Sequence, residues 1–331
     1  MSNPVMNDPV LSIEDLECDF LTVEGIVYAV SGMSLKLRRG EIHGIVGESG
    51  CGKSVGTRAV MGLLEKKHSR IKGAAFFDGR DLLKLNENEM RHIRGRRISM
   101  VFQDPLNSLS PLETVGNQIE EAMTNHFPAL PKEKLRNTCL SLLEKVGLHP
   151  GTAGQYPFEL SGGMQQRVMI AQAISCEPEI LIADEPTTAL DVTIQAQVLE
   201  LLKTLQREMK LSVLLITHNF AVVAGTCDRV SVMYSGRIVE TAPTESLINK
   251  AAHPYSRALI GCIPRGRSGT GGKLPVIPGF PPRLYEPAVG CPFAPRCTFV
   301  SASCRAAPPA TEIEEGHLVF CHHPLGEALR G

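Results

Sequence analysis

Residues 47–54 read GESGCGKS, which fits the pattern G-x-x-x-x-G-K-[ST] of a phosphate-binding loop. The apolar segment EIHGIV precedes the loop and a helical segment follows it, so the context is strand, loop and helix. Glycines allow backbone N–H groups to turn toward phosphate oxygens, and a helix N-terminus favours an anion. In this pattern Lys53 supplies a cation for the β- and γ-phosphates, and the Ser54 hydroxyl is a Mg²⁺ ligand. The sequence therefore predicts that ATP or GTP binds to the loop residues Gly47, Glu48, Ser49, Gly50, Cys51, Gly52, Lys53 and Ser54.

The segment ILIADE is an apolar strand that ends in two acids. A carboxylate at such a strand end can hold Mg²⁺, which suits Asp184, and the adjacent Glu185 can act as the base that polarises the attacking water. A second apolar segment, SVLLITH, ends in His218, which could contact the γ-phosphate. The alternatives are two solvated acids and a structural histidine, and the phosphate loop in the same chain favours the catalytic interpretation.

The composition is that of an ordinary globular protein, because 43% of the 331 residues are hydrophobic and 21% are charged. The formal net charge of −1 argues against a protein that binds nucleic acid by electrostatic attraction. The N-terminus lacks the basic and apolar regions of a secretory signal, and no apolar run approaches the ~18 residues that cross a bilayer. We therefore expect a cytoplasmic protein whose thiols stay reduced.

The distribution of apolar residues predicts an α/β core with a helical insertion. Alternating apolar and polar residues over 11–46 indicate successive strands, whereas residues 113–177 carry helical spacing. The apolar runs EILIADE and SVLLITH are typical of buried parallel strands, with a helix between them. After about residue 250 the chain becomes rich in Pro, Gly and Cys. The predicted domains are 1–250, with a helical subdomain at about 105–177, and a loop-rich C-terminal domain at 251–331.

Five motifs in a fixed order make the chain resemble the ABC ATPases. Besides the phosphate loop and ILIADE, the segment LSGGMQQR looks like the family's signature, VFQD supplies the Q-loop glutamine Gln103, and ALD supplies the D-loop aspartate Asp191. His218 matches the switch histidine. The resemblance implies a phosphate-loop fold of the ABC type, with a parallel core sheet, an antiparallel β subdomain and a helical insertion.

The resemblance also implies that two ATPase subunits sandwich two ATP molecules head to tail. In that arrangement Ser161 and Gly163 of the signature close over the γ-phosphate of the opposite subunit, and Gln103 senses Mg²⁺ and links the site to a membrane partner. Taken alone, Ser161 could be a helix cap. The family stacks adenine on an aromatic residue upstream of the loop; Tyr28 and Phe20 are candidates, and a core or edge-strand role is the alternative.

Longer segments resemble the peptide/nickel importer subfamily, and most of all its D-type ATPase subunits. They are QDPLNSLSPLETVGNQI, ADEPTTALDVTIQAQVLELL, HPYSRALIGCIP and VIPGFPPRLYEPAVGCPFAPRC. The resemblance implies import of oligopeptides or dipeptides by a peripheral subunit at the cytoplasmic face of the bacterial inner membrane. Its implied partners are a paralogous ATPase in a heterodimer, two transmembrane permeases and an extracytoplasmic solute-binding protein. Asn219 and Cys51 depart from common residues of the family without removing a catalytic group.

A rival interpretation is a soluble ABC ATPase that acts on nucleic acid and has a zinc-bound tail. The basic segment RHIRGRRIS is its best support. That segment is short and lacks the interleaved aromatic residues of a nucleic-acid surface, so a solvated basic face is the favoured reading. We therefore expect no nucleic-acid partner.

Four of the ten cysteines cluster near the C-terminus with the spacing C-x5-C-x6-C-x16-C. They are Cys291, Cys297, Cys304 and Cys321. The other six are scattered singly and are interpreted as small apolar residues. A structural zinc site usually has tight C-x2–4-C pairs, which this tail lacks, and four thiolates can instead hold a [4Fe–4S] cluster. Similar tails in peptide-importer ATPases carry such a cluster, so the resemblance favours iron and sulfide over zinc and over four free thiols. His317, His322 and His323 could replace a thiolate, but a surface role is favoured for them.

Overall fold

The computed structural model describes residues 9–188, 190–263, 276–282, 284–287 and 289–326. The chain divides into two compact units. The first unit comprises residues 1–10, 37–42 and 84–216, and the second comprises residues 11–36, 43–83 and 217–331. Each unit is therefore built from segments far apart in the sequence. The predicted domain boundary near residue 250 falls inside the second unit and stays a prediction.

The first unit is built on a parallel sheet. Its strands are β8 (Ser212–Thr217), β7 (Ile180–Asp184) and β6 (Ile98–Val101), paired in that order. The pairs Asp184 with Ile216 and Val101 with Ala183 mark the register near the carboxyl ends. Both β7 and β8 are buried along their whole length. The prediction that these two apolar runs are buried parallel strands is confirmed.

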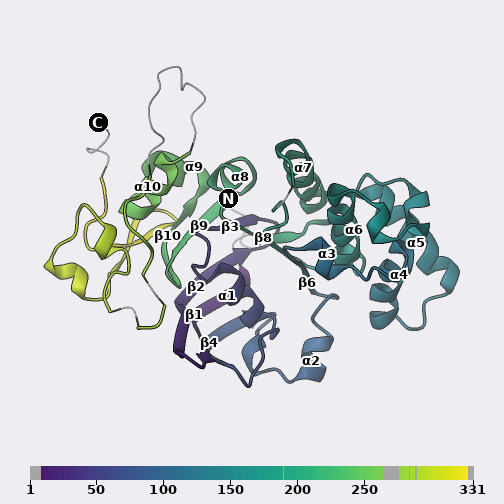
Figure 1. The fold of residues 1–331 in the computed structure, drawn as a ribbon, viewed down its shortest axis with the longest axis horizontal. Coiled ribbons are helices and arrows are strands. Elements are labelled where there is room, and N and C mark those ends of the chain that lie inside the picture. Colours follow the sequence, from purple (N-terminus) through teal and green to yellow (C-terminus); the bar gives the residue numbers. More distant parts are fainter. Residues whose placement is uncertain (1–8, 189, 264–275, 283, 288, 327–331) are drawn as a thin grey trace, which may run out of the picture. The chain divides into compact units, whose positions relative to one another are not determined.

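The helices of the first unit include the predicted helical insertion. They are α2 (Glu87–Arg91), α3 (Pro105–Ser108), α4 (Val115–His126), α5 (Lys132–Lys145), η3 (Pro150–Gly154), η4 (Pro157–Glu159), α6 (Gly162–Ile174) and α7 (Val192–Met209). Figure 1 shows α4, α5 and α6 side by side. Helix α5 begins after Pro131, a residue type that favours the start of a helix, and it buries Leu135, Cys139, Leu142 and Leu143 on one face.

The second unit contains an antiparallel sheet with the order β2-β1-β4-β5. The strands are β1 (Pro9–Thr22), β2 (Gly25–Arg38), β4 (Ser69–Phe77) and β5 (Arg80–Asp81). Leu11 pairs with Phe77 and Phe20 with Ser69. Helix α1 (Lys53–Val60) packs against this sheet through Gly56, where an added Cβ would lie 2.8 Å from the sulfur of Met33. The expected antiparallel β subdomain is therefore present.

The same unit also contains five further strands, which neighbour one another in the order β11-β12-β10-β9-β3. Its strands are β3 (Ile42–Val46), β9 (Arg229–Tyr234), β10 (Arg237–Pro243), β11 (Ala310–Glu314) and β12 (His317–Phe320). The remaining helices are η2 (Leu82–Lys84), α8 (Phe220–Thr226), α9 (Thr244–Lys250), α10 (Pro254–Gly261), η5 (Ala294–Arg296) and η6 (Ala302–Arg305). The segment RVSVMYSGRIVETA predicts a hairpin that turns at Ser235 and Gly236. This prediction is confirmed, since the two residues join β9 to β10 and have φ values of 47° and 79°, as a type I′ turn requires.

The cysteine-rich tail is joined to this sheet, because Glu240 of β10 pairs with Val319 of β12. The expected surface role of His317 is wrong. Its side chain is fully buried, and its Nε2 lies 2.7 Å from Oε1 of Glu240, which is also fully buried. The same carboxylate accepts the backbone N–H groups of Ala252 and His253. A buried carboxylate is tolerated only with such partners, so this group fixes where the tail meets the sheet.

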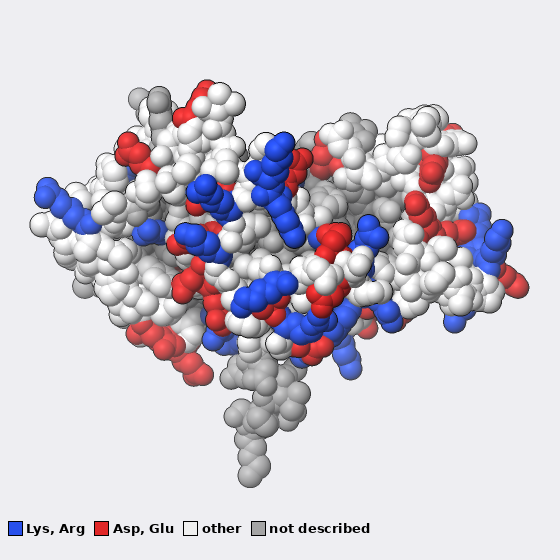
Figure 2. Space-filling model, turned by 90° about the horizontal axis from the view of Figure 1, so that it is seen from below, with Lys and Arg blue, Asp and Glu red and all other residues white. Residues whose placement is uncertain are grey.

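Charged residues of both signs are interspersed on the face of the molecule drawn in Figure 2. In the basic segment that could suggest nucleic-acid binding, the arginines have partners within the first unit. Arg94 lies 2.6 Å from Glu87, and Arg97 lies 2.6 Å from Glu179. Paired guanidinium groups are a poor surface for phosphates. In the part of the chain that the structure describes, no helix has the length and apolar character needed to cross a membrane.

Candidate active site

The phosphate loop connects β3 to α1, and two of its glycines are required by close backbone contacts. A Cβ at Gly47 would lie 2.1 Å from the carbonyl oxygen of Met233, and one at Gly52 would lie 2.2 Å from that of Ala29. Gly52 also has a φ of 101°, which side chains rarely tolerate. The glycine pattern that the sequence presents therefore has a direct steric cause.

Lys53 begins α1 and is only 4% exposed. Its Nζ donates hydrogen bonds to the carbonyl oxygens of Gly47 and Glu48, at 2.9 and 3.0 Å. The ammonium group thus lies across the loop with carbonyl groups as acceptors, ready for the stronger charge-assisted bonds that phosphate oxygens provide. Ser54 follows in the first turn of α1 and is half-buried. Burial raises the pKa of the Cys51 thiol, and the nearby Lys53 partly opposes this effect.

The predicted acids lie at the carboxyl end of β7 in the first unit. Asp184 is fully buried, whereas Glu185 is half-buried and has a φ of 47°, in the left-handed region. One oxygen of Glu185 accepts hydrogen bonds from Gln103 Nε2 at 3.2 Å and from Thr188 Oγ1 at 2.8 Å. The structure therefore brings the Q-loop glutamine and the proposed base together. Thr188, which sequence reasoning missed, holds the same carboxylate.

The signature and D-loop residues lie at the start of two helices. Ser161 caps α6 by accepting the N–H of Met164 at 3.4 Å, and Asp191 caps α7 by accepting the N–H of Ile194 at 3.0 Å. Gly163 touches this second helix, since an added Cβ would lie 2.7 Å from Cγ2 of Ile194. Ser161 and Asp191 are nevertheless exposed. The cap interpretation of Ser161 is confirmed, and an exposed helix N-terminus also leaves room for an anion.

Tyr28 and His218 lie in the second unit, as does the phosphate loop. Tyr28 is half-buried on β2, and its N–H donates to the carbonyl of Leu284 at 2.7 Å. His218 is exposed directly after β8. The neighbouring Asn219 caps α8 by accepting the N–H of Ala221 at 3.0 Å.

The four clustered cysteines line one small cavity in the second unit. Three of them accept a backbone N–H from the residue two positions later: Cys291 from Phe293, Cys297 from Phe299 and Cys321 from His323. Burial raises the pKa of Cys291, Cys297 and Cys321, and these N–H groups oppose it by favouring the thiolate. Among the residues that the structure describes, no group of three or more His, Cys, Asp or Glu side chains is arranged to hold a single metal ion.

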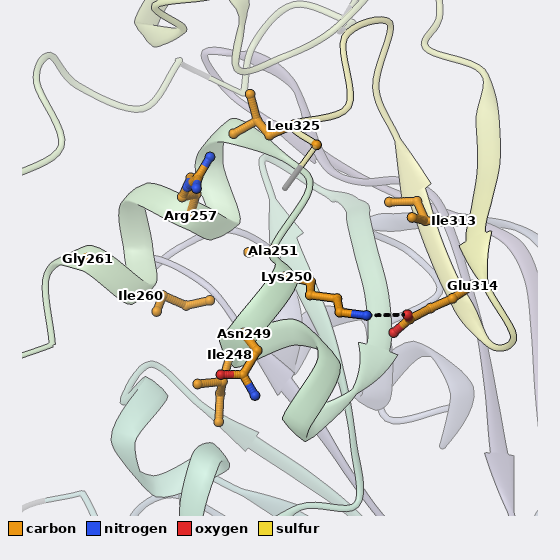
Figure 3. Close-up of a pocket in the computed structure, with 11 residues that line it drawn as sticks. Ile248, Asn249, Lys250, Ala251, Arg257, Ile260, Gly261, Ile313, Glu314 and Leu325 are labelled. Carbon is orange, nitrogen blue, oxygen red and sulfur yellow. Dashed lines mark hydrogen bonds and ion pairs between the residues drawn. The ribbon is translucent and has the colours of Figure 1, made fainter. Parts of the chain in front are cut away.

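A separate cavity of about 650 Å³ lies between α9, α10 and β11, and no residue of the nucleotide motifs lines it (Figure 3). Its walls combine apolar side chains, such as Ile260 and Ile313, with an ion pair between Lys250 Nζ and Glu314 at 3.0 Å. That pair joins α9 to the hairpin of the tail.

Two family models match the chain. Residues 30–188 match the model described as "ABC transporter". Residues 239–304 match the model described as "Oligopeptide/dipeptide transporter, C-terminal region". The second match includes three of the four clustered cysteines and ends before Cys321.

Curated relatives are similar over nearly the whole chain. The Sinorhizobium fredii protein "Probable peptide ABC transporter ATP-binding protein y4tR" is 48% identical, covering 97% of this chain and 96% of its own length. The Bacillus subtilis "Dipeptide transport ATP-binding protein DppD" is 48% identical, with 95% and 94% covered. The Escherichia coli "Oligopeptide transport ATP-binding protein OppD" is 44% identical, with 97% and 95% covered.

Solved structures of similar fold are ATP-binding cassettes. A dimeric post-hydrolysis state of the cassette MJ0796 bound to ADP and Pi has a TM-score of 0.64 and 29% identity, covering 71% of this chain and 98% of that chain. The cassette cbiO1 of Clostridium perfringens has a TM-score of 0.63 and 28% identity, covering 73% and 91%. These matches confirm the expected α/β fold.

Proposed function

The chain belongs to the ABC transporter family of ATPases, in the group that carries the oligopeptide/dipeptide transporter C-terminal region, and from this premise we propose that it drives a bacterial peptide importer. It is an ATPase coupled to transport, and ATP and Mg²⁺ are general to the family. The observation that carries the proposal is the complete set of nucleotide motifs joined to that C-terminal region. A nucleic-acid ATPase has no comparable support.

We assign the catalytic roles residue by residue. Lys53 binds the β- and γ-phosphates, Ser54 and Asp184 hold Mg²⁺, and Glu185 is the base for the attacking water. Gln103 contributes to Mg²⁺ binding and to coupling with the membrane partner. Its hydrogen bond to Glu185 supports a position beside the proposed base.

The remaining assignments concern the adenine ring of ATP, its γ-phosphate and the division of the chain into domains. Tyr28 stacks on adenine and His218 contacts the γ-phosphate, and both positions lie in the same unit as the phosphate loop. Residues 251–331 form the C-terminal domain of the importer group.

The subunit works as a heterodimer with a paralogous ATPase. Ser161 and Asp191 are exposed at helix N-termini, which suits contact with ATP and the phosphate loop of a partner. Two permeases and an extracytoplasmic solute-binding protein complete the importer, and the chain lies at the cytoplasmic face of the inner membrane. The names of the relatives, ATP-binding proteins of peptide transporters, support this assembly.

Reconstitution of the importer tests both the substrate class and the heterodimer. We expect ATP-driven uptake of a labelled dipeptide or oligopeptide into vesicles that contain both permeases, this chain and its paralogue. Omitting the paralogue should abolish uptake, because each composite ATP site then lacks its partner. Full uptake with this chain as the sole ATPase would contradict the heterodimer. Absence of uptake of the labelled peptides by the complete assembly would contradict the peptide substrate.

The clustered cysteines fit a [4Fe–4S] cluster better than a zinc ion. Structural zinc sites usually have tight C-x2–4-C pairs, which the spacing of these four cysteines lacks. A [4Fe–4S] cluster takes four thiolates, and these four side chains line one shared cavity. The cluster is held by Cys291, Cys297, Cys304 and Cys321. When bound it cross-links the tail, and its binding supplies folding free energy.

Anaerobic purification with metal and sulfide analysis tests the cluster. We expect brown protein with about four Fe and four sulfide per chain, and loss of both in Cys297→Ser. Cys262→Ser is the matched control, because Cys262 lies on α10's C-terminus outside the thiol cavity. Colourless protein with one zinc per chain would refute the iron–sulfur assignment.

A further inference from the structure

Residues of the tail hold Glu48, the second residue of the phosphate loop, by both its side chain and its backbone. Nη1 of Arg296 donates to the two carboxylate oxygens of Glu48 at 3.1 and 2.9 Å. The backbone N–H of Glu48 donates to the hydroxyl of Tyr255 at 3.0 Å. All three residues belong to the second unit, so the contact is internal to one compact body. Sequence reasoning missed Arg296 and Tyr255.

Arg296 is itself firmly held. Its side chain is only 5% exposed, and it donates to the carbonyl oxygens of Pro278 at 2.8 Å and Ile277 at 3.2 Å. The guanidinium also lies 5.8 and 5.9 Å from the ring centres of Tyr234 and Phe293. Because all these partners fix its position, Arg296 can fix the position of Glu48 in turn.

The ion pair also has an electrostatic consequence for ATP binding. Glu48 places a carboxylate in a loop whose predicted ligand is a triphosphate. Two negative groups close together repel strongly where solvent screening is weak. The Arg296 guanidinium neutralises this carboxylate. The carbonyl of Glu48 meanwhile accepts a hydrogen bond from Lys53 at 3.0 Å, so the position of Glu48 also affects the lysine that faces the phosphates.

We propose that Arg296 is a positioning residue for the phosphate loop, and that the cysteine-rich tail controls ATP affinity through it. Arg296 directly precedes Cys297, and its N–H donates to the carbonyl of Phe293 at 2.9 Å. The turn that presents it thus runs from Cys291 to Cys297, both in the thiol cavity. A cluster bound by these thiols would hold both ends of the turn and would add to the contacts that fix Arg296. By linkage, ATP binding stabilises this turn in return.

The positioning role is tested by charge rescue. Arg296→Gln should weaken ATP binding about tenfold, because it leaves the Glu48 carboxylate unpaired beside the triphosphate. The double variant Glu48→Gln, Arg296→Gln should return the affinity to within about twofold of the parent, because the repulsive charge is gone. The ATP affinity of Arg296→Lys should lie between those of the parent and Arg296→Gln. Arg305→Gln is the matched control, because Arg305 is an exposed arginine beside Cys304.

These affinities are measured by titration with a fluorescent ATP analogue, after thermal unfolding has shown that each variant is folded. A purely structural role for Arg296 predicts that the double variant binds ATP as weakly as the single one. That outcome, or unchanged affinity in Arg296→Gln, would overturn the positioning role.

The control of ATP affinity by the tail rests in addition on the proposed cluster, so a separate experiment tests it. Cys297→Ser should weaken ATP binding by a similar factor, and adding Glu48→Gln should remove most of that loss. Cluster loss without a change in ATP affinity would overturn the control by the tail while leaving the cluster itself established. If the parent protein contains neither iron nor sulfide, the cluster assignment fails, and the arginine and cysteine variants still decide how the tail acts on the loop.

Discussion

Replacing Lys53 by alanine should lower the affinity of the protein for Mg-ATP by roughly 100-fold, because a nearly buried cation aimed at the phosphates is lost. The side chain is 4% exposed, and its Nζ donates hydrogen bonds to two carbonyl oxygens of the loop. In the variant those carbonyl groups lose a donor, which should cost about 1 kcal/mol of folding free energy. Calorimetric titration with ATP and a thermal melt separate the two effects.

The matched control for this prediction is Lys36→Ala, which removes an exposed lysine of β2 in the same unit. Its affinity for ATP should stay within twofold of the parent, since an exposed charge away from the loop is screened by solvent. Parent-like ATP affinity in Lys53→Ala would remove Lys53 from the phosphate site.

Local sequence patterns predicted the scaffold of the site because local physics determines it. The glycines of the phosphate loop follow from backbone contacts that a Cβ would block, as at Gly47 and Gly52. The strand that carries Asp184 is apolar along its length because it is buried between neighbours. The turn at Ser235 and Gly236 is marked by a glycine, the residue type that adopts positive φ without strain. Each feature depends on a few consecutive residues.

The contacts that sequence reasoning missed are all set by tertiary structure. Arg296 and Glu48 are 248 positions apart, and no period or motif connects them. His317 is buried because β12 pairs with β10 and places it against Glu240, a register that depends on the whole sheet. An acid in a phosphate loop was the available signal for Arg296, since such a carboxylate needs a counterion.

Glu185→Gln should lower ATP turnover by about 10²–10⁴-fold while ATP binding is retained, because the amide cannot accept the proton of the attacking water. The replacement keeps the shape of the side chain and an oxygen that can accept from Gln103 and Thr188. The expected result is ATP-bound protein that stays closed with its partner ATPase. Phosphate release measures the turnover, and gel filtration of the mixed subunits in ATP measures the closed form.

A control for this substitution exists at the other end of the same strand. Glu177 precedes β7, is exposed, and has a φ of 51°, so Glu177→Gln makes the same chemical change in a similar backbone conformation. Its turnover should match the parent, because its carboxylate lies at the amino end of β7 and Glu185 follows the carboxyl end. Equal loss of turnover in both variants would point to a disturbed strand, and near-normal turnover in Glu185→Gln would exclude Glu185 as the base. Loss in Glu185→Gln alone, with ATP affinity intact, assigns proton transfer to this one carboxylate.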